Sequence, residues 1–222
     1  TIQRSYQKRG RYTPQGYLCS KDSALLLAAR ESDAECSRLF INANVGLDKH
    51  DFLRRNALYV AAENGRTETV QLLIDAKVDI DAQDTKGHQT ALMLALKNEQ
   101  EACAAQLVHL GANVHIRDRY GNTALMWAAR QGFHASVKVL LDHGAVLESQ
   151  NEHGRNACML AAENGHIACL QLLIGVNADI NAVDTYGRTT LMHSVRYGHL
   201  ACAQLLMDSN ANVNVSATSG LR

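Results

Sequence analysis

Three observations in the 222-residue sequence predict an all-α solenoid, in which helix–turn–helix units stack in a row and project turn loops. A block of similar residues recurs at Gly121–Phe133, Gly154–His166 and Gly187–His199, and each block begins 33 residues after the one before. Apolar residues within each block follow helical spacing. Aromatic residues are only 5% of the chain, so small and aliphatic side chains must form the core, which suits short, closely packed helices.

The repeat frame divides residues 18–216 into six units, namely 18–50, 51–84, 85–117, 118–150, 151–183 and 184–216. The first unit is degenerate, because Leu18 replaces its leading acid and Lys21 replaces its glycine. One extra residue falls in the turn at 87–90, where a loop absorbs it at little cost. A basic N-terminal arm at 1–17 and a short C-terminal tail at 217–222 lie outside the frame.

The fourth unit shows how each helix pair is encoded. Thr123 is placed to cap a first helix that begins at Ala124, because its hydroxyl can accept a backbone N–H of the first turn. Gly132 separates this helix from a second one, whose apolar stripe is formed by Val137, Val139, Leu140 and Leu141. The same pattern, with substitutions, predicts two short helices in every unit.

The second helix of each unit ends at a position that requires a positive φ, which glycine adopts best and asparagine next best. Gly144 stands there in the fourth unit, and other units have Asn44, Asn177 and Asn210. Lys77 holds this position in the second unit. We therefore predict a strained or irregular helix end at Lys77.

These residues resemble the ankyrin-repeat family, whose pattern is a leading Asp, then G-x-T-P-L-H-x-A-A, G-H, V-x-x-L-L and G-A-[DN]-[VI]-N. The fourth unit matches it with Asp118, Gly121, Thr123, Leu125, Ala128, Ala129, Gly132, Val137, Leu140, Leu141, Gly144 and Ala145. Later units add Gly165-His166, Gly198-His199, Ala178–Asn181 and Ala211–Asn214. The family's proline is replaced by Ala57, Ala91, Ala124, Ala157 and Thr190, and its histidine appears only as His193, one place late.

The resemblance implies a curved stack of helix pairs whose loops project as fingers. Fingers and first helices would together line a concave groove, and each unit would bury its apolar face only against its neighbours. It also implies a non-catalytic protein–protein interaction module, and it gives the histidine of each G-H pair the role of bracing the neighbouring turn.

Candidate catalytic and metal-binding residues have structural explanations in this sequence. Four cysteines, Cys36, Cys103, Cys169 and Cys202, share one repeat position, but they lie a repeat apart and cannot share one zinc ion. We interpret them as small, partly buried apolar residues repeated by descent. His166 with Cys169, and His199 with Cys202, offer two ligands each, which is an incomplete site. No nucleophile, phosphate-loop or zinc-protease motif appears, so we predict no enzyme activity, no cofactor and no metal.

The positions that vary in such repeats predict where a partner would bind. Basic residues outnumber acids there, although Lys+Arg and Asp+Glu both total 22 in the whole chain. Arginine and tyrosine, which often anchor interfaces, gather in the last three units. The predicted partner-binding residues are Arg119, Tyr120, Trp127, Arg130, Gln131, His153, Arg155, Tyr186, Arg188, Arg196 and Tyr197. Trp127 could equally pack in the core.

The predicted function is a scaffold or adaptor that binds an acidic protein surface or peptide through this groove. We expect it in the cytoplasm, within a larger assembly such as a cytoskeletal one. No small-molecule substrate and no membrane insertion are expected. A regulatory domain of a larger enzyme or channel is one alternative. Nucleic-acid binding through the groove and the basic arm is another, although a neutral chain argues against it.

Overall fold

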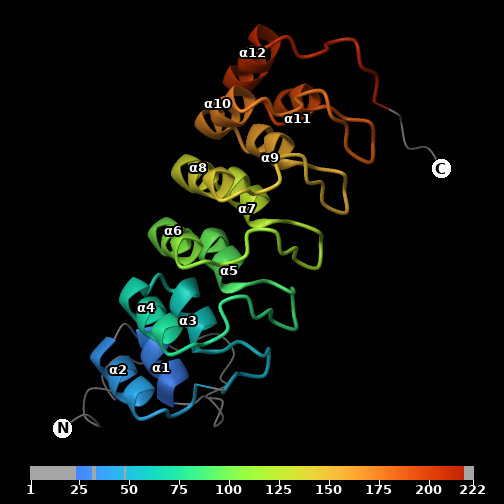
Figure 1. Ribbon diagram of the computed structural model, residues 1–222. Helices are drawn as coiled ribbons and strands as arrows, with labels where there is room; N and C mark the ends of the chain where they lie inside the picture. The colour runs from blue at the N-terminus through green and yellow to red at the C-terminus, as the bar shows by residue number, and fades with distance from the viewer. Residues whose placement is uncertain (1–23, 32–33, 48, 218–222) are drawn as a thin grey trace.

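The computed structural model describes residues 24–31, 34–47 and 49–217, and in them twelve helices form six pairs stacked in one row (Figure 1). The first helices of the pairs are α1 (Ala24–Glu31), α3 (Ala57–Glu63), α5 (Ala91–Lys97), α7 (Ala124–Gln131), α9 (Ala157–Glu163) and α11 (Thr190–Arg196). The second helices are α2 (Ala34–Asn42), α4 (Thr67–Asp75), α6 (Glu101–His109), α8 (His134–Asp142), α10 (Ile167–Gly175) and α12 (Leu200–Asp208). The predicted all-α solenoid is confirmed. The arm at 1–17, Leu18 and Lys21 lie outside the described residues.

Side-chain caps begin the first helices where the sequence predicts them. The Thr123 hydroxyl accepts the backbone N–H of Met126 at 3.4 Å, and Asn156 accepts that of Met159 at 3.0 Å. Asn56, Thr90 and Thr189 cap their helices in the same way. Each such cap contributes about 0.5–2 kcal/mol, because it satisfies a donor that the helix leaves unpaired.

The residues after the second helices have the positive φ that the repeat frame predicts. Gly144 has a φ of 82°, and Asn177 and Asn210 both have 63°. Lys77 adopts 65°, so the predicted strain in the second unit is confirmed. A side chain with a Cβ costs roughly 1–2 kcal/mol in this conformation.

Each unit buries its apolar face against the next unit. Helix α7 packs against α5 on one side and α9 on the other, and α8 packs against α6 and α10. Ala128 and Ala129 of α7 are fully buried, and so are Ala161 and Ala162 of α9, which lets neighbouring first helices approach closely. The core is therefore continuous along the row and made of contacts between neighbouring units.

A leading acid or amide organises each finger. The Asp118 carboxylate accepts the backbone N–H groups of Tyr120 and Asn122 at 2.9 and 2.8 Å, and the turn closes where Asp118 N–H donates to the Asn122 carbonyl at 2.9 Å. Asp84 makes the equivalent closure to Gln89, five residues on rather than four. The extra residue of the sequence is thus accommodated in this turn, and Asp84 is the structural equivalent of the acid that leads the fourth unit.

Neighbouring fingers are joined to one another along the edge of the stack. The backbone N–H of Arg119 donates to the Gly87 carbonyl at 2.8 Å, and that of Glu152 donates to the Tyr120 carbonyl at 3.0 Å. The loops on the right of Figure 1 therefore form one connected row rather than independent loops. This fixes the residues at the finger tips relative to the helices.

The histidines of the G-H pairs brace the preceding unit, as the resemblance implied. His166 Nε2 lies 2.9 Å from the Arg130 carbonyl oxygen, and His199 Nε2 lies 3.0 Å from that of Glu163. Gly132 has a φ of 82°, and a Cβ placed on it would lie 2.5 Å from the His166 ring. Glycine is therefore required there both for its conformation and for the space that the histidine occupies.

Candidate functional site

A hollow of about 410 Å³ opens where the fingers meet the first helices of the second to fifth units. The finger tips contribute Leu53, Lys86, Arg119, Tyr120 and His153 to its lining. The finger bases contribute Arg55, Asp84, Gly87, Gln89, Asn122, Asn151 and Arg155, and the first helices contribute Glu63, Leu94, Lys97, Trp127, Arg130 and Leu160. The predicted groove of fingers and first helices is confirmed by this hollow, which we call the central hollow.

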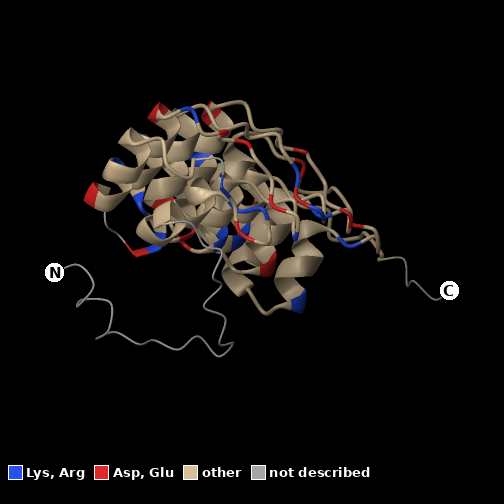
Figure 2. Cartoon of the chain, turned by 90° about the horizontal axis from the view of Figure 1, so that it is seen from below, with Lys and Arg blue, Asp and Glu red and all other residues tan. Residues whose placement is uncertain are grey.

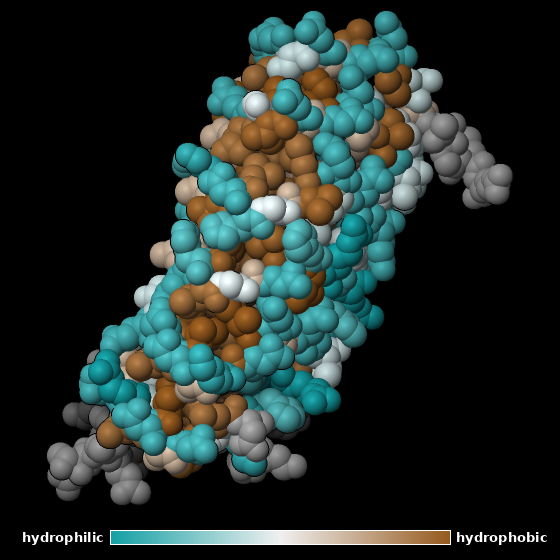
Figure 3. Space-filling view, in the orientation of Figure 1, coloured by the Kyte–Doolittle hydropathy of each residue, from teal (hydrophilic) through white to brown (hydrophobic). Residues whose placement is uncertain are grey.

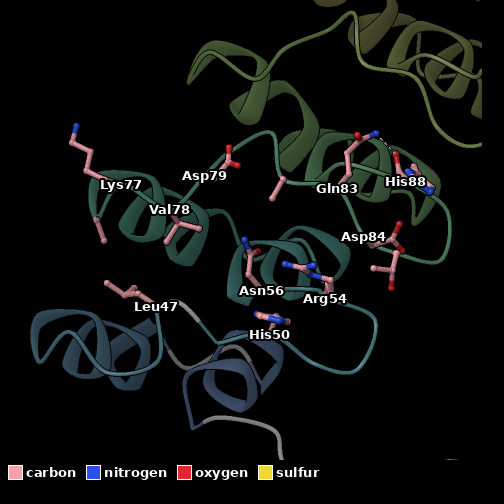
Figure 4. A pocket seen from close by; sticks show the side chains of 13 residues that line it. Leu47, His50, Arg54, Asn56, Lys77, Val78, Asp79, Gln83, Asp84 and His88 are labelled. Atoms are coloured by element: carbon pink, nitrogen blue, oxygen red, sulfur yellow. Dashed lines mark hydrogen bonds between the residues drawn. The ribbon is translucent and has the colours of Figure 1, made fainter.

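A second hollow, of about 700 Å³, lies nearer the N-terminus and has no consistent chemical character. Its lining includes Arg54 and Lys77 but also Asp79 and Asp84 (Figure 4). The Lys77 side chain points away from the other labelled side chains in that view. We therefore place the candidate site in the central hollow.

Charges of both signs lie on the fingers and the helices, so the hollow's character depends on how they pair (Figure 2). The finger side of the stack is largely hydrophilic, whereas apolar patches recur over the helices (Figure 3). Each unit has a finger-base residue and, eight positions later, a residue near the end of the first helix, and the two are in contact in three of the units. These pairs are Arg55 with Glu63, Gln89 with Lys97, Asn122 with Arg130, Arg155 with Glu163, and Arg188 with Arg196.

In the second and fifth units this pairing cancels charge. Arg55 Nη1 lies 3.1 Å from Glu63 Oε2, and Arg155 Nη1 lies 2.8 Å from Glu163 Oε2. The Arg155 and Glu163 side chains are only 22% and 17% exposed, so solvent screens this pair less than it would a surface pair. These two units border the central hollow but add little net charge to it.

In the third and fourth units the helix residue is a cation, and its finger-base partner is a neutral amide. Lys97 Nζ lies 3.3 Å from the Gln89 side-chain oxygen, while Asn122 bonds instead to Asp118. With Lys86 and Arg119 of the finger tips, Lys97 and Arg130 form what we call the central cation cluster. None of the four has a carboxylate within 4.0 Å among the described residues, and all four are exposed.

Trp127 lies at the middle of this cluster. Its indole N–H donates to Asp118 Oδ2 at 3.2 Å, and its ring packs against the core while also lining the central hollow. Lys97 Nζ lies 5.7 Å from the ring centroid, and Arg130 Cζ lies 5.6 Å from it. The two interpretations of Trp127 thus both apply, since the side chain packs against the core and also lines the hollow, where two cations approach its ring.

The structure divides the other predicted binding residues into two groups. Those that line the central hollow with Trp127 are Arg119, Tyr120, Arg130, His153 and Arg155, and those that do not are Gln131, Tyr186, Arg188, Arg196 and Tyr197. Arg188 is held by the buried Asp184 at 2.8 Å, so it does not present the free charge that the sequence suggested. Arg155 is likewise paired. Arg196 stays exposed and lies 6.0 Å from the Tyr197 ring.

Lys86 and Lys97 were not among the predicted binding residues, although they belong to the cation cluster. Lys97 is in the third unit, away from the arginine and tyrosine residues that directed attention to the last three units. The signal that could have found it is the pattern at eight-residue spacing, in which Lys97 and Arg130 are cations that follow an amide and not a charged residue.

His193, the family histidine that is one place late, lies in a buried network in the sixth unit. Its Nε2 lies 3.0 Å from Asp184 Oδ2, so the ring N–H donates to that carboxylate, and its Nδ1 lies 3.7 Å from Glu163. Burial lowers the pKa of His193, and the hydrogen bond to Asp184 only partly offsets this. Burial opposes ionisation of Asp184, yet bonds from the Arg188 backbone and guanidinium and from Tyr186 leave its pKa lowered.

Acidification is expected to destabilise the protein through His193. The folded pKa lies below the ordinary value of 6.5, so the unfolded chain takes up a proton that the folded chain does not, and stability falls as the pH drops below about 6.5. Urea unfolding at pH about 7.5 and about 5.5 measures the change. His193→Leu, which copies Leu160 at the same repeat position, should reduce this dependence. An unchanged dependence in the variant would show that His193 does not cause it.

Three of the four repeated cysteines are core residues, and Cys36 is half-buried. Cys103, Cys169 and Cys202 are at most 1% exposed, and no disulfide involves them. Burial raises the pKa of Cys103 to about 12 and that of Cys169 to about 11, which keeps the thiols protonated and poorly nucleophilic. Across residues 24–31, 34–47 and 49–217, no three His, Cys, Asp or Glu side chains are grouped as a metal site would require. None of the helices described is long and apolar enough to cross a bilayer.

Comparison with known proteins gives a consistent result. A family model described as ankyrin repeats (3 copies) matches residues 11–84, 77–151 and 145–217. A similar solved chain occurs in the structure of the predatory endopeptidase Bd0816 from Bdellovibrio bacteriovorus in complex with immunity protein Bd3460, at 26% identity and a TM-score of 0.77, covering 85% of this chain and 98% of that one. The ankyrin repeat domain of Bcl-3, a unique member of the IkappaB protein family, is also similar, at 26% identity and a TM-score of 0.77, covering 89% of this chain and 90% of that one. No curated protein gives a sequence match.

Proposed function

Because this chain belongs to the ankyrin-repeat family, whose members generally serve as protein-interaction modules, we propose that it is a non-catalytic scaffold that binds an acidic protein partner through the central hollow. The observation that carries the proposal is the central cation cluster, in which Lys86, Lys97, Arg119 and Arg130 have no carboxylate partner, while Arg55 and Arg155, which line the hollow from the flanking units, are ion-paired. The free positive charge that lines the central hollow is thereby concentrated over two units. An acidic surface would complement it.

Three further observations support a protein rather than a small ligand. The hollow is lined by residues of four successive units, so it suits an extended or protruding surface. Trp127, Tyr120 and arginine also line it, and these are the residue types that most often anchor protein interfaces. One of the similar solved chains occurs in a protein–protein complex. The hollow indicates the chemistry of the partner but not its location in the cell. A cytoplasmic setting, such as a cytoskeletal assembly, therefore stays a prediction.

Binding of simple polymers by the whole chain tests the proposal. We expect poly-L-glutamate to bind at low salt and to be released as salt rises, because screening weakens contacts between exposed charges. Poly-L-lysine, at the same concentration, should bind much more weakly. Failure to bind poly-L-glutamate at low salt would contradict an acidic partner. Tighter binding of single-stranded oligothymidylate than of poly-L-glutamate, with a steep salt dependence, would favour a nucleic-acid function instead.

A further inference from the structure

The central hollow has a spacing that limits what its two innermost cations can recognise. Lys97 and Arg130 occupy equivalent positions on α5 and α7, which pack directly against each other. Packed helices lie about 8–10 Å apart, so the equivalent backbone positions that carry these two side chains are separated by about that distance. Lys97 Nζ and Arg130 Cζ both lie within 6 Å of the Trp127 ring centroid. A ligand that meets both charges therefore passes beside the indole.

An extended peptide in the polyproline II conformation matches this arrangement. Such a peptide has three residues per turn and rises about 3.1 Å per residue, so side chains three positions apart share one face and lie about 9 Å apart. A fully extended β-strand would put those two side chains on opposite faces. The residues between them would lie against Trp127, and aromatic surfaces are a common binding site for proline in this conformation.

The flanking units limit how far an acidic stretch can extend. A third carboxylate in the same register would meet Glu63 on one side or Glu163 on the other, where the local arginine is already ion-paired. No free cation is left at these positions to pair with it. The register of the cluster therefore holds two carboxylates, and a longer acidic run gains no further ion pair in it.

Resting on the proposed function, we propose that the subsite formed by Lys97, Trp127 and Arg130 binds a polyproline II segment of a partner protein that carries two acidic residues three positions apart, with proline or another apolar residue between them. Each carboxylate pairs with one cation, and the intervening residues cover the indole. Lys86 and Arg119 lie at the finger side of the same hollow and add positive charge near the segment.

The fluorescence of Trp127 reports directly on this subsite, because it is the one tryptophan of the chain. The probes are synthetic peptides in a Gly-Ser background that contain Glu-Pro-Pro-Glu, the rearranged Glu-Glu-Pro-Pro, or the uncharged Gln-Pro-Pro-Gln. We expect Glu-Pro-Pro-Glu to change the emission and to bind roughly two- to fivefold more tightly than Glu-Glu-Pro-Pro, since one exposed charge contact is gained. Gln-Pro-Pro-Gln should bind weakest.

Two variants make the result specific to the cluster. Lys97→Gln should abolish the preference for Glu-Pro-Pro-Glu over Glu-Glu-Pro-Pro, whereas Lys138→Gln, an exposed residue on α8 outside the hollow, should retain it. If the two charged peptides bind equally well while poly-L-glutamate still binds, the proposed spacing of three positions between the acidic residues is wrong. The proposed function would then still stand. Failure of every acidic probe, poly-L-glutamate included, would overturn both.

Discussion

Replacing Leu140 with alanine is expected to lower the free energy of unfolding by about 2–5 kcal/mol, because the side chain is 1% exposed and the change leaves a cavity. Leu140 lies on α8, which packs against α7 in its own unit and against α6 and α10 in the neighbouring units. The cavity therefore weakens contacts on both sides of the middle of the stack. Because the stability of such a stack is close to a sum over neighbouring units, the loss should be felt along the whole chain.

Urea unfolding followed by circular dichroism measures this loss, and Lys138→Ala is its matched control. Lys138 lies on the same helix but is exposed, so its substitution should change stability by no more than about 0.5 kcal/mol. Similar losses for the two variants would mean that the burial of Leu140 does not determine its contribution.

Reversing both inner cations, as Lys97→Glu with Arg130→Glu, is expected to weaken binding of poly-L-glutamate by about 30- to 100-fold. Each exposed charge contact contributes up to about 1 kcal/mol, and reversal replaces attraction with repulsion, so two sites give roughly 2–3 kcal/mol. Fluorescence anisotropy of labelled poly-L-glutamate measures the change. Its salt dependence should also decrease, because fewer charges are compensated on binding.

Both residues are exposed on the first helices, so the reversal should leave the fold intact, which circular dichroism checks. Lys138→Glu makes the same kind of change on the second helix of the fourth unit and lies outside the hollow. It should reduce binding by no more than about twofold, through the change in net charge alone. A loss as large as that of the double variant would indicate that net charge, and not the cation cluster, governs binding.

The sequence predicted most of the fold because the fold depends on local rules that repeat. Thr123 and Gly144 occupy positions where capping and a positive φ select the residue type, and both behave as expected. Even the misfit at Lys77 could be predicted, since the same position holds glycine or asparagine in the other units. Six units in register reinforce such weak local signals.

The candidate site could be predicted only in part, because charge pairing depends on side-chain geometry. The sequence indicated the arginines of the last three units as partner-binding residues, but Arg155 forms an ion pair with Glu163, and Arg188 forms one with Asp184. The free charge that lines the central hollow lies in the third and fourth units, where Lys97 contacts Gln89. Trp127 was ambiguous for a similar reason. Its side chain both packs against the core and lines the hollow, which helical spacing alone does not reveal.

The central claim is that unpaired cations in the third and fourth units, and not basic residues in general, hold the acidic partner. The most direct test compares the affinity for poly-L-glutamate of two double variants, Lys97→Gln with Arg130→Gln and Arg155→Gln with Glu163→Gln. The first removes free charge from the cluster, and the second removes one ion pair without changing net charge. We predict a loss of about tenfold for the first and of less than about twofold for the second. Equal losses in the two variants, or none in the first, would contradict the account.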